Sequence, residues 1–377
     1  MTNKYDFSAL SEFLDYITSV RIPGNECIVY KNNERVFDYV SGFSDISIKK
    51  KMEKGLLYNM YSATKPITCT GVMKLIENGK ISLDTPISLY LPEFSEMYIK
   101  DGENIKKAEK QITVRHLLSH TSGIAFNVRT KHILNAKKEG RISTREIVKE
   151  IAKDYLSFDP GDSWLYGLSH DVLGALIEEV SGEKFGDFLK NYIFTPLGME
   201  NTSFHLKKED EENLATQYFY NKEERKVQKV LNKNNFKLTD EYEAGGAGLI
   251  STAEDYIKFV SAMTNLGMGL NGERILKEET VNLMRETTLN ENQQKAFIWE
   301  SMPDYTYGLG VRVMKEREKF GSPSSNGEFG WGGAGGVYML SDPENKLSIV
   351  YFQHMLESWE EFVHPRLRNL VYKITKN

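Results

Sequence analysis

Cysteine is scarce in this chain, with only Cys27 and Cys69 among its 377 residues. Two cysteines cannot build a disulfide framework, and these two lack the short spacing of a metal site. The seven histidines are scattered and no H-E-x-x-H motif occurs, so we expect no metal centre. The composition fits a reducing compartment, although a single bridge between the two cysteines stays open.

Long apolar runs are also missing. No stretch of about 18 or more apolar residues occurs, so the sequence predicts no membrane span. The N-terminal stretch carries apolar side chains at helical spacing with acidic residues among them, which is typical of an amphipathic helix and not of a signal peptide. These apolar positions are Phe7, Leu10, Phe13, Leu14 and Ile17. We therefore expect a soluble, cytoplasmic protein.

The chain lacks a large excess of charge of either sign. Its 48 basic and 53 acidic residues give a net charge of -5. Such a balance provides no global attraction to nucleic acid or to anionic lipid. We expect a small-molecule substrate and neither nucleic acid nor a membrane as partner, while the oligomeric state stays undetermined.

Nucleotide-binding motifs are absent as well. Residues 330–335 formally match G-x-G-x-x-G, but the match leads into an apolar run of strand length and not into a helix, so it fails the context test for a dinucleotide site. No Walker loop and no G-x-S-x-G elbow occurs, and we expect no cofactor. Glycines packed this closely beside a strand instead allow another backbone or a ligand to approach.

The chain does contain a hydroxyl and an amine three residues apart, at Ser62 and Lys65. A strand-like run over residues 56–61 precedes them, and apolar residues at helical spacing follow. Pro66 fits only near a first turn, so the helix must start close to Ser62. Because residues i and i+3 share a helix face, Lys65 could take the Ser62 proton. This stretch alone is equally compatible with an ordinary N-cap beside a solvated lysine.

The same S-x-x-K form recurs at Ser47 and at Ser181. Ser47 leads into a lysine-rich polar run, and Ser181 is followed by Gly182, a residue type that commonly ends helices. Neither serine begins a buried helix. The local context therefore favours Ser62 as the candidate nucleophile.

Strand patterns occur near both ends of the chain and helical patterns lie between them. The predicted strands span residues 26–31, 34–40, 307–314, 335–340 and 347–352. Asn32-Asn33 is a good hairpin turn between the first two strands. Helices are predicted over residues 1–20, 143–151, 169–181, 185–198 and 359–372, and from residue 251 onward. The pairs Ser143/Glu146 and Ser251/Glu254 match the capping-box pattern.

These patterns predict an α+β fold, an α/β sandwich in which helices flank an antiparallel sheet. We expect residues 1–80 and 246–377 to form the sheet domain and residues 81–245 to form a mainly helical inserted domain. The charged stretch 205–240 is either a surface excursion or a mobile flap over the site. Tyr166 lies in a loop just before a predicted helix, where a tyrosine is usually a packing residue.

Taken together, the chain resembles the serine hydrolases of the class C β-lactamase and penicillin-binding-protein fold, and is most similar to the esterases of that fold. The resemblance rests on five motifs in the family's order. They are Ser62-x-x-Lys65, residues 116–123, Tyr166, residues 245–249, and Trp331-Gly332-Gly333. It implies a β-lactamase/transpeptidase-like fold over nearly the whole chain.

The resemblance also implies a mechanism. Ser62 attacks a carbonyl to give an acyl-enzyme while Lys65 and Tyr166 share the proton, and water later releases the acyl group. Backbone N–H groups of Ser62 and Ala334 would hold the oxyanion. The segment Trp331, Gly332 and Gly333 would line the substrate.

Two positions depart from the family pattern. Trp331 stands where β-lactamases and carboxypeptidases of this fold usually carry Lys or His, and Leu168 stands where the tyrosine motif usually ends in Asn. Both changes weaken recognition of a β-lactam or an acyl-D-alanine peptide. We therefore favour hydrolysis of carboxylic esters of small neutral or apolar substrates.

Two alternatives stay open at this point. The first is a β-lactamase or D-alanyl-D-alanine carboxypeptidase in which another cation, such as Arg312, binds the substrate carboxylate. The second is a binding or assembly protein that keeps the fold without turnover.

Overall fold

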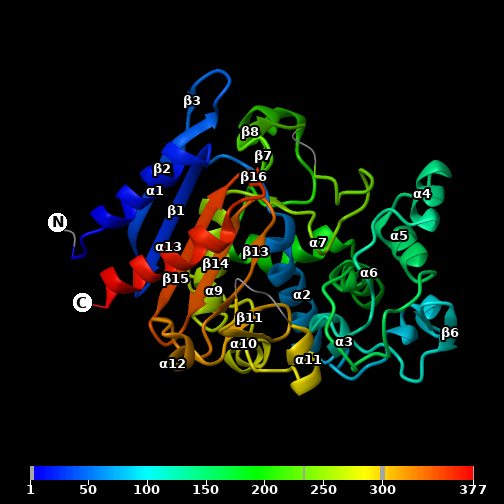
Figure 1. The fold of residues 1–377 in the computed structure, drawn as a ribbon. Helices are drawn as coiled ribbons and strands as arrows, with labels where there is room; N and C mark the ends of the chain where they lie inside the picture. The colour runs from blue at the N-terminus through cyan, green and yellow to red at the C-terminus, as the bar shows by residue number, and fades with distance from the viewer. Residues whose placement is uncertain (1–3, 232–233, 298–301, 377) are drawn as a thin grey trace.

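A central antiparallel sheet runs through one half of the protein (Figure 1). The computed structural model describes residues 4–231, 234–297 and 302–376. Within these residues the sheet has nine strands in the order β10-β11-β12-β14-β15-β1-β2-β3, with β13 paired to β14. Their bounds are β1 Gly24–Lys31, β2 Glu34–Asp45, β3 Lys50–Lys51, β10 Tyr305–Tyr307, β11 Arg312–Met314, β12 Phe329–Gly330, β13 Gly332–Gly333, β14 Val337–Asp342 and β15 Leu347–Gln353. The prediction of one antiparallel sheet built from both ends of the chain is confirmed.

The strands join where the sequence has turn-forming residues. Asn32 and Asn33, between β1 and β2, have φ angles of 53° and 65°, which suit the tight turn that matches the twist of two paired strands. Strand β15 pairs with β14 on one side and with β1 on the other. The predicted hairpin and the predicted pairing of the last two long strands are confirmed.

Helices cover both faces of the sheet. Helices α1 (Ser8–Val20) and α13 (Glu360–Thr375) share one core cluster with Val29 and Ile349, while α9 (Ala253–Thr264) shares the other with Ile28 and Val350. Neighbouring residues of β1 and β15 thus enter opposite cores, as the two-residue period of a strand requires. Burial of each such aliphatic side chain stabilises the fold by roughly 1.5–3 kcal/mol.

The remaining helices lie mostly on the side of the molecule away from the two termini (Figure 1). The α-helices are α2 Lys65–Glu77, α3 Val114–Leu118, α4 Lys131–Lys138, α5 Thr144–Ile151, α6 Ser169–Ser181, α7 Phe185–Leu189, α8 Thr195–Leu197, α10 Glu278–Met284, α11 Glu291–Ala296 and α12 Arg317–Phe320. The shorter or irregular ones are η1 Tyr61–Thr64, η2 Ile87–Leu89, η3 Pro92–Phe94, the π-helix η4 Lys190–Phe194, and η5 Lys208–Asn213. The proposed domain boundaries at residues 80 and 246 stay a prediction.

Short strands outside the central sheet tie distant segments together. They are β4 Tyr58–Asn59 with β9 Ile250–Ser251, β5 Tyr98–Asp101 with β6 Asn104–Lys107, and β7 Tyr218–Asn221 with β8 Lys226–Lys229 and β16 Met355–Leu356. The β7–β8 hairpin lies inside the charged stretch 205–240, and β7 pairs with β16 in parallel. Tyr218 is buried and its hydroxyl donates to Asp45. This part of the stretch is therefore an anchored surface excursion; residues 232–233 lie outside the described residues.

Most predicted helices are confirmed, including the capping box at α5. The Ser143 hydroxyl accepts from the Glu146 N–H at 3.3 Å, and the Glu146 carboxylate accepts from the Ser143 N–H at 3.0 Å. The N-terminal helix begins at Ser8, while residues 1–3 lie outside the described residues.

Three local predictions are wrong. The cap of α9 is Thr252, which accepts from the Asp255 N–H, because Ser251 is held extended in β9. The single strand predicted over residues 307–314 is two strands, β10 and β11, separated by a turn in which Gly310 has a φ of 88°. Of the run 56–61, only β4 is extended. In each case tertiary pairing and turns shift or shorten the element that the local pattern predicted.

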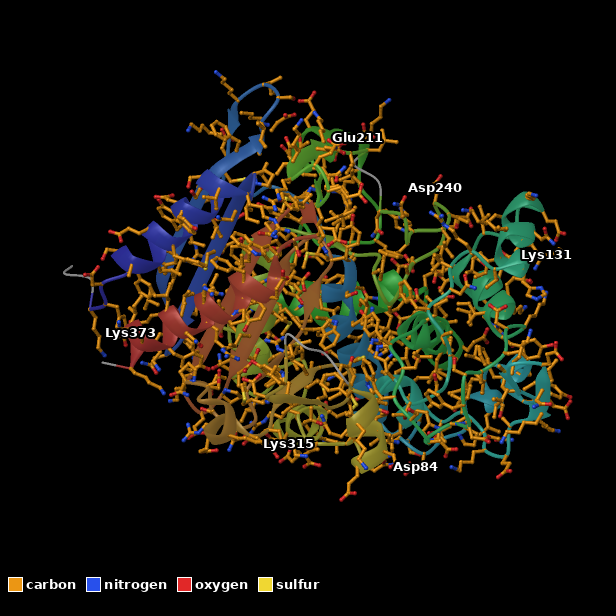
Figure 2. The ribbon with its side chains drawn as sticks, viewed as in Figure 1. Asp84, Lys131, Glu211, Asp240, Lys315 and Lys373 are labelled. Carbon is orange, nitrogen blue, oxygen red and sulfur yellow. The ribbon has the colours of Figure 1, made fainter. Side chains whose placement is uncertain are left out.

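Charged side chains of both signs lie around the periphery of the molecule (Figure 2). The exposed Lys131 and Glu211, labelled there, come from α4 and η5. Among the described residues, no helix combines the length and the apolar character that crossing a bilayer requires.

Candidate active site

A sharp turn leads the chain into α2 at Ser62. Ser62 belongs to the 3-10 helix η1, and α2 follows directly at Lys65 with Pro66 in its first turn. Tyr61 has a φ of 47°, a left-handed conformation that costs a non-glycine residue about 1–3 kcal/mol and is often found at functional sites. The predicted helix start is confirmed, and Ser62 is only partly buried.

The structure brings the three predicted catalytic side chains together. Lys65 Nζ donates to Ser62 Oγ at 3.3 Å, and the Tyr166 hydroxyl donates to the same oxygen at 2.6 Å. Tyr166 reaches it from the loop that precedes α6. These distances allow direct proton transfer between Ser62 and either partner.

Lys65 is buried, with 1% of its surface exposed. Its Nζ donates to the carbonyl oxygen of Gly246 at 2.6 Å and lies 4.5 Å from the centre of the Tyr166 ring. Gly246 belongs to the 245–249 motif. The amine is thus held between the Gly246 carbonyl, the Tyr166 ring and the Ser62 hydroxyl.

Tyr166 is held within a group of aromatic rings. Its ring centre lies 5.9 Å from that of Trp331, 4.9 Å from that of His120 and 6.1 Å from that of Phe126. Phe126 in turn meets Phe236 edge-on at 5.4 Å. These contacts fix the direction of the Tyr166 hydroxyl and place apolar surface beside Ser62.

The Trp-Gly-Gly segment lies against the turn that carries Ser62. A Cβ added to Gly333 would be 2.2 Å from the carbonyl oxygen of Met60, so only glycine allows this approach of β13 to η1. Ala334 follows directly, is exposed, and lines the same cavity as Ser62. This placement is compatible with the predicted oxyanion donors at Ser62 and Ala334.

A cavity of about 270 Å³ opens beside Ser62. Its walls come from the loop before α6, from the Trp-Gly-Gly segment, from β10, β11 and β14, and from α13. They comprise Ser62, Tyr166, Met302, Tyr305, Arg312, Trp331, Gly332, Gly333, Ala334, Tyr338, Glu360, His364, Pro365 and Arg368. Leu168, the other departure from the family pattern, is buried in the main core.

The sequence analysis missed the contribution of α13 to this cavity. Glu360, His364 and Arg368 recur every four residues and so share one face of the helix. Burial raises the pKa of Glu360 to about 7 and lowers the pKa of His364 to about 3. The four-residue spacing of these ionisable groups, in a helix that also carries buried apolar residues, could have indicated that this face of α13 lines a cavity.

Arg312 also lines the cavity, but its guanidinium already has partners. It donates to the carbonyl oxygen of Met339 at 3.1 Å and to the Glu328 carboxylate at 3.4 Å, and it is 2% exposed. Burial raises the pKa of Glu328, and the charges of Arg312 and Arg368 oppose that shift.

Two further buried groups behind Lys65 were missed. Burial raises the pKa of Asp171, and burial followed by the Lys65 charge lowers the pKa of His170 to about 3. Both residues follow Tyr166 closely in the sequence, in the first turn of α6. Among the described residues, no group of His, Cys, Asp or Glu side chains converges in a way that could hold a metal ion.

Comparison with known proteins gives matches over nearly the whole chain. A family model described as Beta-lactamase matches residues 9–373. Esterase EstB from Burkholderia gladioli is 25% identical over 358 residues, which cover 88% of this chain and 85% of EstB. Protein Rv1367c from Mycobacterium tuberculosis is 29% identical over 330 residues, which cover 83% of this chain and 81% of that protein.

A solved structure is similar at the level of the fold and of the sequence. EstCE1, described as a hydrolase with promiscuous acyltransferase activity, superposes with a TM-score of 0.82 at 25% identity. The match covers 97% of this chain and 98% of EstCE1.

Proposed function

The chain belongs to the beta-lactamase family and is a serine hydrolase, and from that premise we propose that it hydrolyses carboxylic esters through an acyl-enzyme on Ser62. The observation that carries the proposal is the position of Ser62 Oγ, 2.6 Å from the Tyr166 hydroxyl and 3.3 Å from Lys65 Nζ, at the edge of an apolar cavity. EstB, an esterase, supports the ester as the substrate class.

The reaction begins with loss of the Ser62 proton. Lys65 accepts it, directly or through Tyr166, as Ser62 Oγ bonds to the ester carbonyl carbon. The carbonyl oxygen becomes an oxyanion, which N–H groups of Ser62 and Ala334 stabilise. As the tetrahedral intermediate collapses, the carbon–oxygen bond to the alcohol breaks, Tyr166 protonates the departing alkoxide, and Lys65 returns its proton to Tyr166. Water then attacks the acyl carbonyl carbon and gives one proton to the Lys65–Tyr166 pair. The bond from the carbon to Ser62 Oγ breaks, Ser62 Oγ takes that proton, and the acid leaves.

The cavity walls support small neutral or apolar substrates. Trp331 and Tyr305 are almost completely buried, and with Tyr338 and Met302 they give the cavity a mainly apolar, aromatic lining. Trp331 offers no charge to a substrate carboxylate, unlike Lys or His at that position. An uncharged acyl group therefore meets few unpaired polar groups here.

A β-lactamase or D-alanyl-D-alanine carboxypeptidase activity is the second candidate. It is supported by Arg312 and Arg368, two guanidinium groups on the wall of the same cavity. The contact between Arg312 and Glu328 reduces the positive charge that a substrate carboxylate would meet, so ester hydrolysis remains the first proposal. Nitrocefin hydrolysis faster than ester hydrolysis would reverse this order.

Hydrolysis of p-nitrophenyl acetate and butyrate tests the proposal. We expect the wild type to turn both over and the Ser62→Ala variant to lose the activity. Ser47→Ala is the matched control, because Ser47 has the same S-x-x-K spacing but lies exposed in a turn. Equal activity in wild type and Ser62→Ala would refute the assignment of the nucleophile.

We further propose a reducing, cytoplasmic location. Cys27 and Cys69 are both buried and free, which is usual for proteins kept in a reducing compartment. Cell fractionation with antibodies against the chain tests this, and recovery outside the cytoplasm would contradict it.

A further inference from the structure

A carboxyl group lies buried behind the catalytic lysine. Asp171 stands in the first turn of α6 and is 4% exposed. An ionised carboxylate is costly to bury unless hydrogen bonds and an opposite charge compensate for the lost water. Its surroundings provide both kinds of compensation.

The partners of Asp171 come from the segment that also holds Lys65. The Tyr242 hydroxyl donates to Asp171 Oδ1 at 2.6 Å, and the Gly246 N–H donates to the same carboxylate. A Cβ placed on Gly246 would lie 2.5 Å from Asp171 Oδ2 and 3.4 Å from Lys65 Nζ. The backbone of Gly246 therefore lies between the two groups, with its N–H on Asp171 and its carbonyl oxygen on Lys65.

We propose that Asp171 is a positioning residue that holds the Gly246 carbonyl on Lys65 and, as a carboxylate, sets the pH dependence of Ser62 activation. The inference rests on the proposed ester hydrolysis and adds a residue to it. A buried negative charge stabilises a cation close to it. Loss of the Asp171 charge should therefore move the acid limb of the pH–rate profile.

The other titratable groups around Lys65 do not supply this charge. Among the described residues they are Cys69 on α2, His170 on α6, His120 after α3, and Tyr166. Burial lowers the pKa of His170 to about 3 and holds that of His120 well below its usual value, so both rings are neutral near pH 7. Burial raises the pKa of Cys69, which keeps its thiol neutral.

The pH dependence of kcat/KM for p-nitrophenyl acetate tests the proposal. Asp171→Asn keeps the size of the side chain and removes its charge, so the acid limb should move to lower pH by about one unit or more. A lower rate with an unmoved acid limb would show that Asp171 has only a structural role and would overturn the proposal. Asp255→Asn is the matched control, since Asp255 is also buried in the first turn of a helix but accepts from the Asn201 N–H, away from Lys65; its acid limb should stay in place.

A second variant keeps the test informative if Asp171→Asn does not fold. Tyr242→Phe removes one hydrogen bond from the carboxylate and retains the buried ring. Because the carboxylate then holds its proton more readily, the acid limb should move in the same direction by a smaller amount. If Asp171→Asn does not fold, an acid limb at the same pH in wild type and Tyr242→Phe would overturn the proposal.

Labelling of Ser62 by a fluorophosphonate separates this inference from the proposed function. Its pH dependence reports the reactivity of Ser62 whatever the natural substrate is. A wild type that is labelled but hydrolyses no ester would refute the ester proposal alone. Identical pH dependences of labelling in wild type and Asp171→Asn would refute the role of Asp171 alone.

Discussion

The Tyr166 hydroxyl lies closer to Ser62 Oγ than the Lys65 amine does, at 2.6 Å against 3.3 Å. Both groups donate to the same oxygen, and the ring of Tyr166 also lies beside Lys65 Nζ. Tyr166 is therefore the shorter route for a proton between Ser62 and either Lys65 or a departing alcohol.

Removing this hydroxyl should slow the chemical step. We expect Tyr166→Phe to lower kcat by about 100- to 10,000-fold, the usual contribution of a general acid or base, with little change in KM because the aromatic contacts remain. Steady-state kinetics with p-nitrophenyl acetate measures this. Tyr16→Phe, on the exposed face of α1, should leave both constants unchanged; a loss below about tenfold in Tyr166→Phe would exclude general acid–base catalysis by Tyr166.

A methyl group at Gly333 should displace the proposed oxyanion donors. Its Cβ would be 2.2 Å from the Met60 carbonyl oxygen, so β13 or η1 must move. We expect Gly333→Ala to lower kcat by about 100- to 1,000-fold, as loss of one oxyanion donor does. Gly332→Ala places its Cβ 3.1 Å from the Val337 carbonyl oxygen. This variant should lower kcat clearly less than Gly333→Ala does. Equal losses in the two variants would contradict the special role of the Gly333 contact.

Phe126 should discriminate between acyl chains. It is 42% exposed, and its ring faces those of Tyr166 and Phe236. Phe126→Ala should reduce kcat/KM for a p-nitrophenyl hexanoate about tenfold more than for the acetate, because the longer chain loses apolar contact. Comparison of kcat/KM across a series of chain lengths tests this against Leu89→Ala, an exposed apolar control. A loss independent of chain length would rule out contact between Phe126 and the acyl chain.

Glu360 should make stability depend on pH. Its pKa in the folded protein is about 7, raised by burial, against about 4.3 in an unfolded chain. Between these values the native state binds more protons, so the free energy of unfolding falls as pH rises through this window and stays low above it.

Replacing this carboxyl should remove that loss of stability. The stability of Glu360→Gln relative to wild type should increase by about 1–3 kcal/mol between pH 4 and pH 8; the lower part of this range applies because Glu360 is partly exposed. Urea unfolding at several pH values measures the difference. Glu361→Gln, at an exposed position on the same helix, should show no such trend, and a parallel trend in both variants would argue against burial of Glu360 as the cause.

Local patterns predicted the helix that begins beside Ser62 and the short distance between Ser62 and Lys65. Ser62, Lys65 and Pro66 lie within one short stretch, so spacing and turn chemistry alone limited their arrangement. Tyr166 and Trp331 could be assigned only through the family resemblance, because nothing local indicates that residues so far apart in sequence meet at Ser62.

The missed features depend on tertiary contacts. In the sequence Asp171 has the pattern of an ordinary acidic residue in the first turn of a helix. Only the folded structure places Gly246 and Tyr242 around it. In the sequence Glu360 has the pattern of an acidic residue at a helix N-terminus. Only the packing of α13 beside the cavity shows that it lines the cavity wall. The turn between β10 and β11 was missed because its apolar residues continue a strand pattern, while Gly310 takes a left-handed conformation.

The pairing of β1 with β15 bears on how the protein is made. Asn25 in β1 lies opposite Gln353 in β15. During translation at about 5–20 residues per second, β15 is therefore synthesised roughly 15–65 s after β1. Gly333 also reaches the ribosome exit long after Ser62. A nascent chain released before residue 333 thus carries Ser62 without the Trp-Gly-Gly segment that lies against it, so the proposed active site is complete only near the end of translation.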